Sequence, residues 1–333
     1  MPELPEVETV RRALRLELVG RRITAVRGRA IAMRRPLEVE NLRTVLPGRR
    51  FLEPRRRGKF LLLDTGLAGI SHQLPAAAGD APHPEVFSRF GVLDVLSSTT
   101  PRPSGRKPHW ARHLADLATK ADEKRRLAGS LLIHLGMSGI IQLVPAAAPL
   151  RAHTHLILEL DDGREFRFVD PRRFGLAAWL EPGAEADDPS LRTLGMEPLD
   201  PNLPQSLPAI VRRRRAPIKS LLLDQHLVAG IGNIYAAEAL WRAGIHPRRA
   251  GNRISVARLA VLATTIQEVL AEAIAEGGTT LRDFATPDGS SGYFAVSLQV
   301  YGRQGKPCVR CGATLRAEAI GGRTTAWCPR CQR

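Results

Sequence analysis

The sequence predicts an α+β chain of more than one domain: an N-terminal β-sandwich led by one helix, then a helical domain that ends in a cysteine-bearing β-hairpin. Three observations predict this fold class. An amphipathic helical segment precedes a series of short β-like runs, the pattern turns helical beyond a proline-rich stretch at 197–208, and all four cysteines lie between residues 308 and 331. We therefore expect a β-rich domain first and helices after it.

The first domain is expected at residues 1–196. Residues 5–19 form its leading helix, because apolar residues from Val7 to Leu18 recur at helical spacing. The strands that follow either alternate with period two or are short apolar runs between turn residues. They are expected at Ile23–Val26, Phe60–Asp64, Leu131–Leu135, His155–Leu160 and Arg164–Val169.

Residues 67–128 interrupt this pattern and are expected to be an insertion at a loop tip. The segment is rich in Ala, Pro, Ser and charged residues, and it separates two strand-like runs that a short hairpin would join. We expect the insertion to project away from the functional surface. The proline-rich stretch at 197–208 is expected to be a hinge between domains.

The second domain, expected at 209–295, is helical. Helices are expected at about 217–225, from Asn233 to Ala243 with Asn at the N-cap, and over about 255–276. The first two of these helices and the turn between them predict a helix–two-turn–helix.

The chain is strongly basic, which favours a polyanionic partner. Lys and Arg number 49 against 33 acids, a net charge of +16, and nucleic acid is the commonest polyanion. The alternative is an arginine-rich protein from a GC-rich genome. No apolar run reaches about 18 residues and the N-terminus lacks the pattern of a secretory signal, so we expect a cytoplasmic protein that does not span a membrane.

The last segment, 296–333, is expected to be a zinc-bound hairpin. Two Cys-x-x-Cys pairs supply four thiolates for one tetrahedral zinc ion: Cys308, Cys311, Cys328 and Cys331. Two disulfides are the alternative, although clustered cysteines in a cytosolic chain favour metal. Gly321 and Gly322 form the expected hairpin tip. Arg323 follows them and is either a solvated side chain or a phosphate contact.

The N-terminus offers a second kind of chemistry. Removal of the initiator Met before a small residue exposes the secondary amine of Pro2. Model α-amino groups titrate at about 7.7–8.0, so the free amine can attack a sugar aldehyde carbon and form an iminium. Glu3 and Glu6 are candidate proton-transfer groups. The alternative is that these residues only open a helix, with acids at its favourable end.

Three turns suit contacts with DNA. Residues 230–233 (GIGN) precede a helix, and glycines there let backbone N–H groups approach a phosphate, while the basic run 212–215 lies upstream. Residues 170–175 (DPRRFG) place arginines beside Phe174, which suits a cation and an apolar wedge. Residues 134–139 (HLGMSG) contain Met137. Each feature has an alternative. Residues 230–233 could be a common glycine-rich turn, and the basic run 212–215 could be a solvated surface. The other two turns could bury Phe174 and Met137 beneath them.

Together these motifs resemble the formamidopyrimidine-DNA glycosylase family, over nearly the whole chain outside 67–128. The matching segments are MPELPEVETVRR at 1–12, RRRGKFLLL at 55–63, HLGMSG, DPRRFG, GIGNIYAAEALWRAGIHP at 230–247, GGTTLRDF and GYFAVSLQVYGRQGKPC within 277–308, and the cysteine set. The resemblance implies a bifunctional glycosylase/AP lyase that excises oxidised purines (8-oxoguanine and formamidopyrimidines) from double-stranded DNA and nicks the strand by β,δ-elimination.

The resemblance also implies roles for individual residues. Pro2 would form a Schiff base at C1′, Glu3 would supply a proton to the sugar, Lys59 would be a proton donor in the elimination, and Arg323 would hold phosphate near the lesion. The implied DNA contacts are His134, His153, Arg172, Arg214, Lys219 and Asn233. Met137, Arg172 and Phe174 match the wedge that fills the gap left by a flipped base, and the loop at 285–293 would close over that base.

Other functions remain open. Relatives that prefer oxidised pyrimidines share the N-terminus and the hairpin, although the intact HLGMSG and DPRRFG motifs favour the purine branch. A non-catalytic DNA-binding relative would be indicated by loss of Pro2, Glu3 or Lys59, and all three are present. A basic zinc protein that binds RNA would need no free Pro2 amine. One set of DNA-contact motifs per chain suits a monomer.

Overall fold

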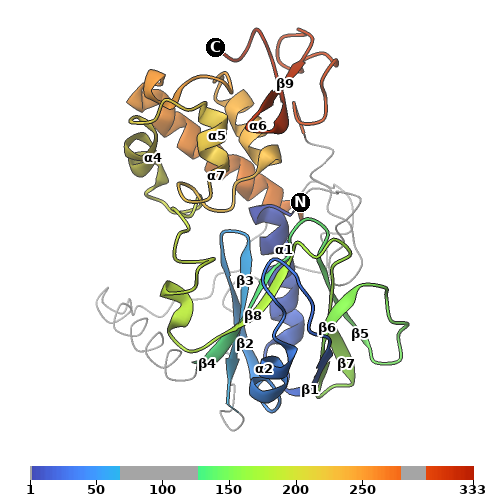
Figure 1. Ribbon diagram of the computed structural model, residues 1–333. Coiled ribbons are helices and arrows are strands. Elements are labelled where there is room, and N and C mark those ends of the chain that lie inside the picture. The colour runs from blue at the N-terminus through green and yellow to red at the C-terminus, as the bar shows by residue number, and fades with distance from the viewer. Residues whose placement is uncertain (1, 68–126, 279–297) are drawn as a thin grey trace, which may run out of the picture. The chain divides into compact units, whose positions relative to one another are not determined.

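The computed structural model describes residues 2–67, 127–278 and 298–333, and these residues belong to one compact unit (Figure 1). Met1, most of the expected insertion and the loop at 285–293 lie outside the described residues. Among the described helices, none is long and apolar enough to cross a membrane.

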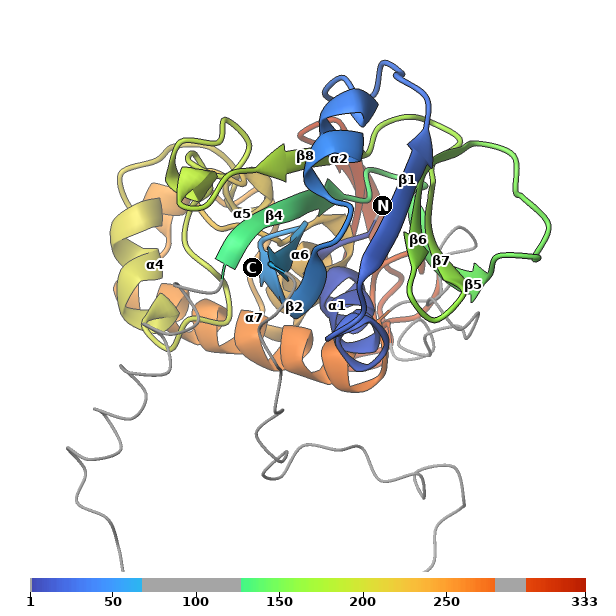
Figure 2. The ribbon, with the colours of Figure 1, turned by 90° about the horizontal axis from the view of Figure 1, so that it is seen from below.

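The N-terminal half is a sandwich of two antiparallel four-stranded sheets, as the sequence predicts. The first sheet has the order β1 (Ile23–Gly28), β6 (Thr154–Leu160), β7 (Arg164–Val169), β5 (Ile140–Pro145). The second has the order β2 (Arg50–Arg57), β3 (Phe60–Gly66), β4 (Leu127–His134), β8 (Leu176–Leu180). Seen from below, the strands of the two sheets lie on opposite sides of this half (Figure 2).

One apolar core joins the two sheets to the leading helix, α1 (Leu4–Leu18). Val7, Val10, Leu14 and Leu18 of α1 are all buried in it, together with side chains from both sheets. A shorter helix, α2 (Val39–Val45), packs against β1. Each Å² of apolar surface removed from water stabilises the folded state by about 25 cal/mol, so this core is the main stabilising element of the N-terminal half.

The C-terminal half is helical. It comprises α4 (Leu203–Val211), α5 (Ile218–Leu223), α6 (Asn233–Arg242) and α7 (Val256–Ala275), with short 3₁₀ helices at Ala184–Ala186 and Gly251–Arg253. These four helices share a second core around the buried ring of Tyr235. Helix α7 also packs against α1, so the two halves are in direct contact.

The chain ends in a two-stranded hairpin, β9 (Arg316–Ile320) and β10 (Arg323–Trp327), as predicted. A third apolar cluster forms at its base, where Trp241 of α6 and Leu315 pack against Cys308 and Cys328. The hairpin is therefore attached to the helical half through α6.

Several expectations need correction. Strands β2, β5 and β8 and helix α2 have no counterpart in the sequence-based assignment, and α4 begins at Leu203 within the stretch expected to be a hinge. The N-cap of α6 is Gly232, not Asn233. Strands β3 and β4 do pair, up to Gly66 opposite Leu127, so the expected insertion starts and ends at one hairpin.

Candidate active site and nucleic-acid interface

The N-terminal residues are built into the protein at the junction of its two halves. Pro2 is buried, and the backbone N–H of Leu4 donates to the carbonyl of Gly230, 3.0 Å away. Gly230 lies in the turn before α6. The start of the chain is thus fixed to the turn that the sequence singles out as a phosphate site.

Glu3 caps two helices at once. Its side chain completes a capping box at the start of α1. The same carboxylate accepts hydrogen bonds from the backbone N–H groups of Ile234 (3.0 Å) and Tyr235 (3.4 Å), in the first turn of α6. A Cβ atom at Gly232 would lie 2.2 Å from Cδ of Glu3, so only glycine leaves room for this carboxylate. The positive end of the α6 dipole favours its charge.

Glu6 supports Glu3 from one turn further along α1. Its carboxylate accepts the backbone N–H of Glu3 at 2.8 Å and the hydroxyl of Tyr235 at 2.5 Å. Tyr235 is almost fully buried in the helical core. The position of Glu3 therefore depends on residues from both halves of the protein.

Lys59 lies between β2 and β3 with only 6% of its surface exposed. Burial lowers the pKa of Lys59; Glu3 opposes the shift, while Arg323 and Arg34 add to it. Burial raises the pKa of Glu3, against the effect of Lys59. The two pKa values move towards each other, which reduces the free-energy cost of proton transfer near neutral pH.

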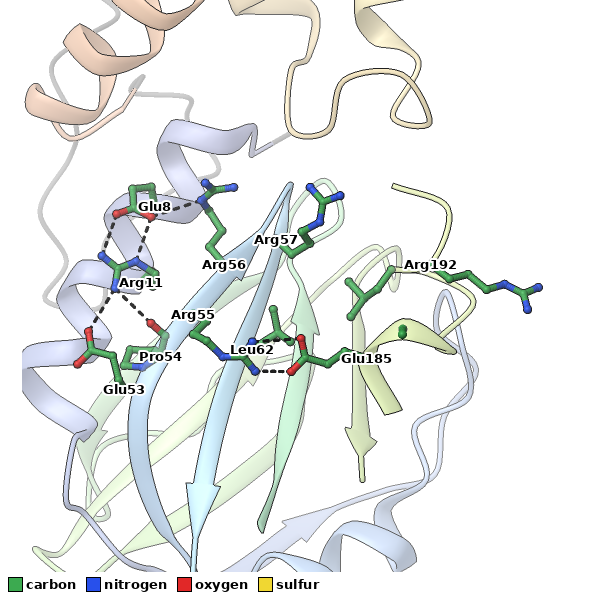
Figure 3. A pocket seen from close by; sticks show the side chains of 12 residues that line it. Glu8, Arg11, Glu53, Pro54, Arg55, Arg56, Arg57, Leu62, Glu185 and Arg192 are labelled. Atoms are coloured by element: carbon green, nitrogen blue, oxygen red, sulfur yellow. Dashed lines mark hydrogen bonds and ion pairs between the residues drawn. The ribbon is translucent and has the colours of Figure 1, made fainter. Parts of the chain in front are cut away.

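The arginine run before Lys59 is occupied by protein contacts. Arg55, Arg56 and Arg57 line a cavity of about 750 Å³ beside α1 (Figure 3). Glu197 accepts from Arg56 and Arg57 at 2.9 Å each and from the backbone N–H of Gly58 at 2.5 Å. Arg55 forms salt bridges with two other acidic side chains. This run therefore holds the turn that presents Lys59.

The two turns expected to enter DNA meet at one cavity of about 570 Å³. Its lining includes His134, Met137, Arg172 and Phe174. Phe174 is 49% exposed, and the guanidinium of Arg172 lies 5.1 Å from the centre of its ring. An exposed aromatic ring beside a cation suits insertion between bases, and it excludes the alternative in which Phe174 is buried under the turn.

His134 is neutral and oriented. Burial, with Arg34 and Lys59 nearby, lowers the pKa of His134 to about 3. Its Nδ1 accepts the backbone N–H of Gly136 at 2.9 Å, which assigns the proton to Nε2. His134 can therefore donate a hydrogen bond from Nε2 to an anion in the cavity at neutral pH.

Arg34 belongs to this site, although no motif in the sequence indicated it. Its backbone N–H donates to the carbonyl of Gly175, its guanidinium lies 5.9 Å from the ring centre of Phe60, and its charge acts on both His134 and Lys59. It also lines the same cavity. It comes from an irregular segment of ordinary composition, so only the fold reveals it.

Lys219 joins the helical half to the hairpin. Its ammonium donates to Oδ1 of Asn233 at 2.6 Å and to the hydroxyl of Thr325 on β10, and the side-chain amide of Asn233 donates to the carbonyl of Thr324 at 3.1 Å. Burial lowers the pKa of Lys219 to about 8, against the effect of Glu3. Arg323 is exposed at the start of β10, and its charge acts on the pKa values of both Lys59 and Lys219.

Two expected DNA contacts stand apart from the buried cluster. His153 is exposed with a φ of 65°. Arg214 is exposed, and its Nε donates to the carbonyl of Ile210 at 3.2 Å. Neither residue lines the cavity next to His134.

The four cysteines fit one zinc ion. They are not disulfide-bonded, and their Sγ atoms all lie within 4.8 Å of one another, with separations of 3.9 Å for Cys308 and Cys331 and 3.4 Å for Cys311 and Cys328. Zn–S bonds of about 2.3 Å in a tetrahedron place sulfur atoms about 3.8 Å apart. The spacing excludes the disulfide alternative in this structure.

Three family models match this chain. The formamidopyrimidine-DNA glycosylase N-terminal domain matches residues 1–82 and 108–177, the H2TH domain of the same glycosylases matches 194–285, and a zinc finger found in FPG and IleRS matches 305–333. The zinc finger match and the cysteine geometry together assign one structural zinc ion.

Similar proteins and structures cover the whole chain. The formamidopyrimidine-DNA glycosylase of Stenotrophomonas maltophilia is 42% identical, with 100% of each chain covered. The crystal structure of the MutM (FPG) protein from Thermus thermophilus has a TM-score of 0.72 at 32% identity, covering 99% of this chain and 98% of that one. The Lactococcus lactis enzyme in complex with DNA containing an abasic site has a TM-score of 0.74 at 28% identity, covering 99% of each chain.

Proposed function

The chain belongs to the formamidopyrimidine-DNA glycosylase family, and from that membership we propose that Pro2, Glu3, Lys59 and Arg323 carry out its chemistry. Members of this family are DNA glycosylases with AP lyase activity, and this chain is one that excises oxidised purines. The observation that carries the proposal is the convergence of Glu3 and Lys59, both buried and with pKa values shifted towards each other, beside the fixed N-terminus.

The first step uses the amine of Pro2 as nucleophile. Its lone pair forms a bond to C1′ of the damaged nucleotide, and the bond from C1′ to the base breaks. The base leaves with the electron pair of the broken bond and takes up the proton that the Pro2 nitrogen gives up. Glu3 protonates the sugar ring oxygen, so the ring opens and an iminium joins Pro2 to C1′. The raised pKa of Glu3 keeps a proton available for this step.

The iminium then allows strand scission. It acidifies the C2′ hydrogen, whose removal expels the 3′ phosphate, and a second elimination expels the 5′ phosphate. Lys59, with its pKa lowered by burial, exchanges protons in these steps, and Arg323 holds the phosphate that leaves. Water finally releases Pro2 from the sugar fragment.

DNA contacts are proposed for the residues around this centre. His134 and Arg34 donate to phosphate beside the cavity, and Met137, Arg172 and Phe174 fill the gap left by the flipped base. Lys219 and Asn233 present the start of α6 to phosphate, and His153 and Arg214 bind the backbone further out. The complexes of the Lactococcus lactis enzyme with DNA that contains Fapy-dG or an abasic site support damaged DNA as the partner.

The zinc ion has a structural role in this proposal. When bound, it fixes the turns at both ends of the hairpin through four thiolates and supplies no chemistry to the substrate. Cys328 is fully buried beneath Trp241, so the hairpin, and with it Arg323, is tied to α6.

The organisation of the chain follows the same proposal. A catalytic domain at 1–196, a connection at 197–208, a helix–two-turn–helix domain at 209–295 and a zinc hairpin at 296–333 would act as one monomer. One complete set of catalytic and DNA-contact residues per chain supports the monomer. A protein that acts on chromosomal DNA of a bacterium works in the cytoplasm.

Borohydride trapping tests the proposal. A labelled duplex with one 8-oxoguanine opposite cytosine is incubated with the protein and borohydride, and the adduct is mapped by mass spectrometry. We expect one covalent adduct, on Pro2. An adduct formed on an oxidised-pyrimidine duplex and absent on the purine duplex would move the chain to the sister branch. Tight binding with no adduct on either duplex would leave only a non-catalytic relative.

A further inference from the structure

One carboxylate connects the two turns that form the cavity. Asp170, at the end of β7, is fully buried. Its Oδ1 accepts the hydroxyl of Ser138 at 2.9 Å, and its Oδ2 accepts the backbone N–H of Gly175 at 2.7 Å. Ser138 belongs to the turn that carries Met137, and Gly175 ends the turn that carries Arg172 and Phe174. The carboxylate therefore bridges the two turns.

The main chain of Asp170 holds a third segment. Its N–H donates to the carbonyl of His153 at 3.0 Å, and Nε2 of His155 lies 2.9 Å from its carbonyl oxygen. Asp170 thus bonds to the carbonyl of His153, whose φ is positive, and to the side chain of His155 two residues later. Three segments proposed to contact DNA converge on Asp170.

The two turns are also in close backbone contact. Gly136 has a φ of +64°, and a Cβ atom there would lie 2.5 Å from the backbone of Phe174 and Gly175. A Cβ atom at Gly175 would lie 2.8 Å from the carbonyl of His134 and 2.9 Å from Oδ2 of Asp170. Strand pairing sets the register at both ends of the two turns, through His134 opposite Leu176 and Ile140 opposite Val169. Between these pairs no side chain separates the turns, and the bonds of Asp170 join them directly.

We infer that Asp170, with Ser138, is a positioning element that sets the spacing between Met137 and the pair Arg172 and Phe174. The inference rests on the proposed wedge function of those three residues. A wedge must enter the duplex as one unit, because inserting side chains separately would unstack the bases without filling the gap. The bridge keeps the two parts together before DNA arrives, so the ordering cost is not incurred on binding.

Variants of Asp170 and Ser138 differ in how many of the two side-chain hydrogen bonds of the bridge they keep. Asp170→Asn can keep both contacts, because its Oδ1 can accept from Gly175 and its NH₂ can donate to the Ser138 hydroxyl oxygen. Ser138→Ala removes only one contact and leaves the Gly175 contact in place. Asp170→Ala removes both. If spacing is what matters, the order of activity is wild type, Asp170→Asn, Ser138→Ala, Asp170→Ala.

The experiment measures excision and gap filling separately. Single-turnover excision of 8-oxoguanine gives the rate, and 2-aminopurine placed opposite a stable abasic analogue reports insertion of the wedge by fluorescence. We expect Ser138→Ala to lower the rate about tenfold, the effect of losing one charge-assisted hydrogen bond of about 1.4 kcal/mol. The 2-aminopurine signal falls with the rate, and affinity for undamaged duplex changes less than about twofold. Thr44→Ala, which loses a side-chain hydrogen bond on α2, is the matched control.

A double-mutant cycle separates positioning from general stability. In a Met137→Ala background the wedge is already incomplete, so adding Ser138→Ala costs little more. Full additivity of the two losses would overturn the inference, and so would wild-type fluorescence from Ser138→Ala or a loss in Asp170→Asn as large as in Asp170→Ala. If Asp170→Ala does not fold, the double-mutant cycle of Ser138→Ala and Met137→Ala still tests the inference. Failure of the proposed function is a different result, since the wild-type protein itself would then excise nothing.

Discussion

The buried cluster of Glu3 and Lys59 and the exposed rim of Phe174, Arg172 and His153 differ in how far their side chains are exposed to solvent. In the cluster, Glu3 and Lys59 are enclosed, and Glu3 bonds to backbone groups of α6. On the rim, Phe174, Arg172 and His153 are exposed to solvent. The difference separates two tasks. Groups that move protons need fixed positions and shifted pKa values, whereas groups that meet a flexible polyanion need access to it.

The two regions also differ in how they are held. The cluster is assembled from both halves of the chain, through Glu3, Tyr235 and Gly230. The rim is built from turns of the β-sandwich alone, bridged by Asp170. Substitutions in the cluster should therefore abolish chemistry while leaving binding, and substitutions on the rim should weaken binding or insertion while leaving the chemistry of an abasic site.

The largest effect is expected at Pro2. Pro2→Gly, or a form that retains Met1, removes the secondary amine, so excision should fall by about a thousandfold or more, corresponding to roughly 4 kcal/mol. Duplex affinity should stay within about threefold. Single-turnover excision and fluorescence anisotropy measure the two quantities. Comparable losses in excision rate and in duplex affinity would contradict the separation of chemistry in the cluster from binding on the rim.

Loss of the metal comes next. Cys328→Ser removes one of the four thiolates and should release the hairpin that carries Arg323, with an affinity loss of about ten- to a hundredfold. Zinc content by mass spectrometry and duplex affinity are measured together. A variant that loses zinc but keeps full affinity would show that the hairpin is held by apolar contacts alone.

Arg214 tests the proposed DNA contact of the helical half by salt dependence. Arg214→Ala should weaken binding about equally for damaged and undamaged duplex and reduce the slope of log affinity against log salt by about 0.9. Arg192→Ala is the matched control, because Arg192 is an exposed arginine that lines the cavity beside α1. An unchanged slope for Arg214→Ala would place that side chain outside the interface.

His134 lies between the cluster and the rim, because it is buried and also lines the cavity next to Phe174. Its pKa is about 3 in the folded protein and about 6.5 when unfolded. Between these values the unfolded state binds more protons, so stability falls as pH falls from about 6.5 to 3, by at most about 1.4 kcal/mol per pH unit. Urea unfolding across this window should show a shallower dependence for His134→Asn. Identical slopes would mean that His134 binds protons equally in the folded and unfolded states.

The smallest effect is expected from the segment at 67–128 that the sequence predicts to be an insertion. Strands β3 and β4 pair up to Gly66 and Leu127, so replacing residues 69–126 with a short turn keeps the hairpin register. Excision and affinity should stay within about twofold, because short turns connect antiparallel strands well. A large loss would make the insertion part of the DNA-binding surface.

Local patterns predicted much of the fold. Strand β7 and helix α7 follow from period-two and helical spacing. Strand β2 escaped detection because RFLEPRRR combines a proline with four arginines. Helix α4 escaped detection because Pro204 and Pro208 indicate a linker, although Pro204 lies in the first helical turn, where proline is tolerated.

The site was predictable where chemistry requires particular residues at a fixed spacing, as in the cysteine set. Contacts between distant segments carry no local pattern. The capping of α6 by Glu3, the place of Arg34 beside Lys59 and the bridge of Asp170 to Ser138 all depend on tertiary packing. These contacts appear only when the chain is folded.

The bond between Glu3 and Ile234 spans 231 positions along the chain. At about 5–20 residues per second, the ribosome needs roughly ten to fifty seconds between making the two residues. Throughout that interval Glu3 lacks the backbone N–H groups of α6 that fix its carboxylate in the finished chain, so the buried cluster is incomplete. Synthesis order thus delays a strand-cutting activity until the segment that binds DNA exists.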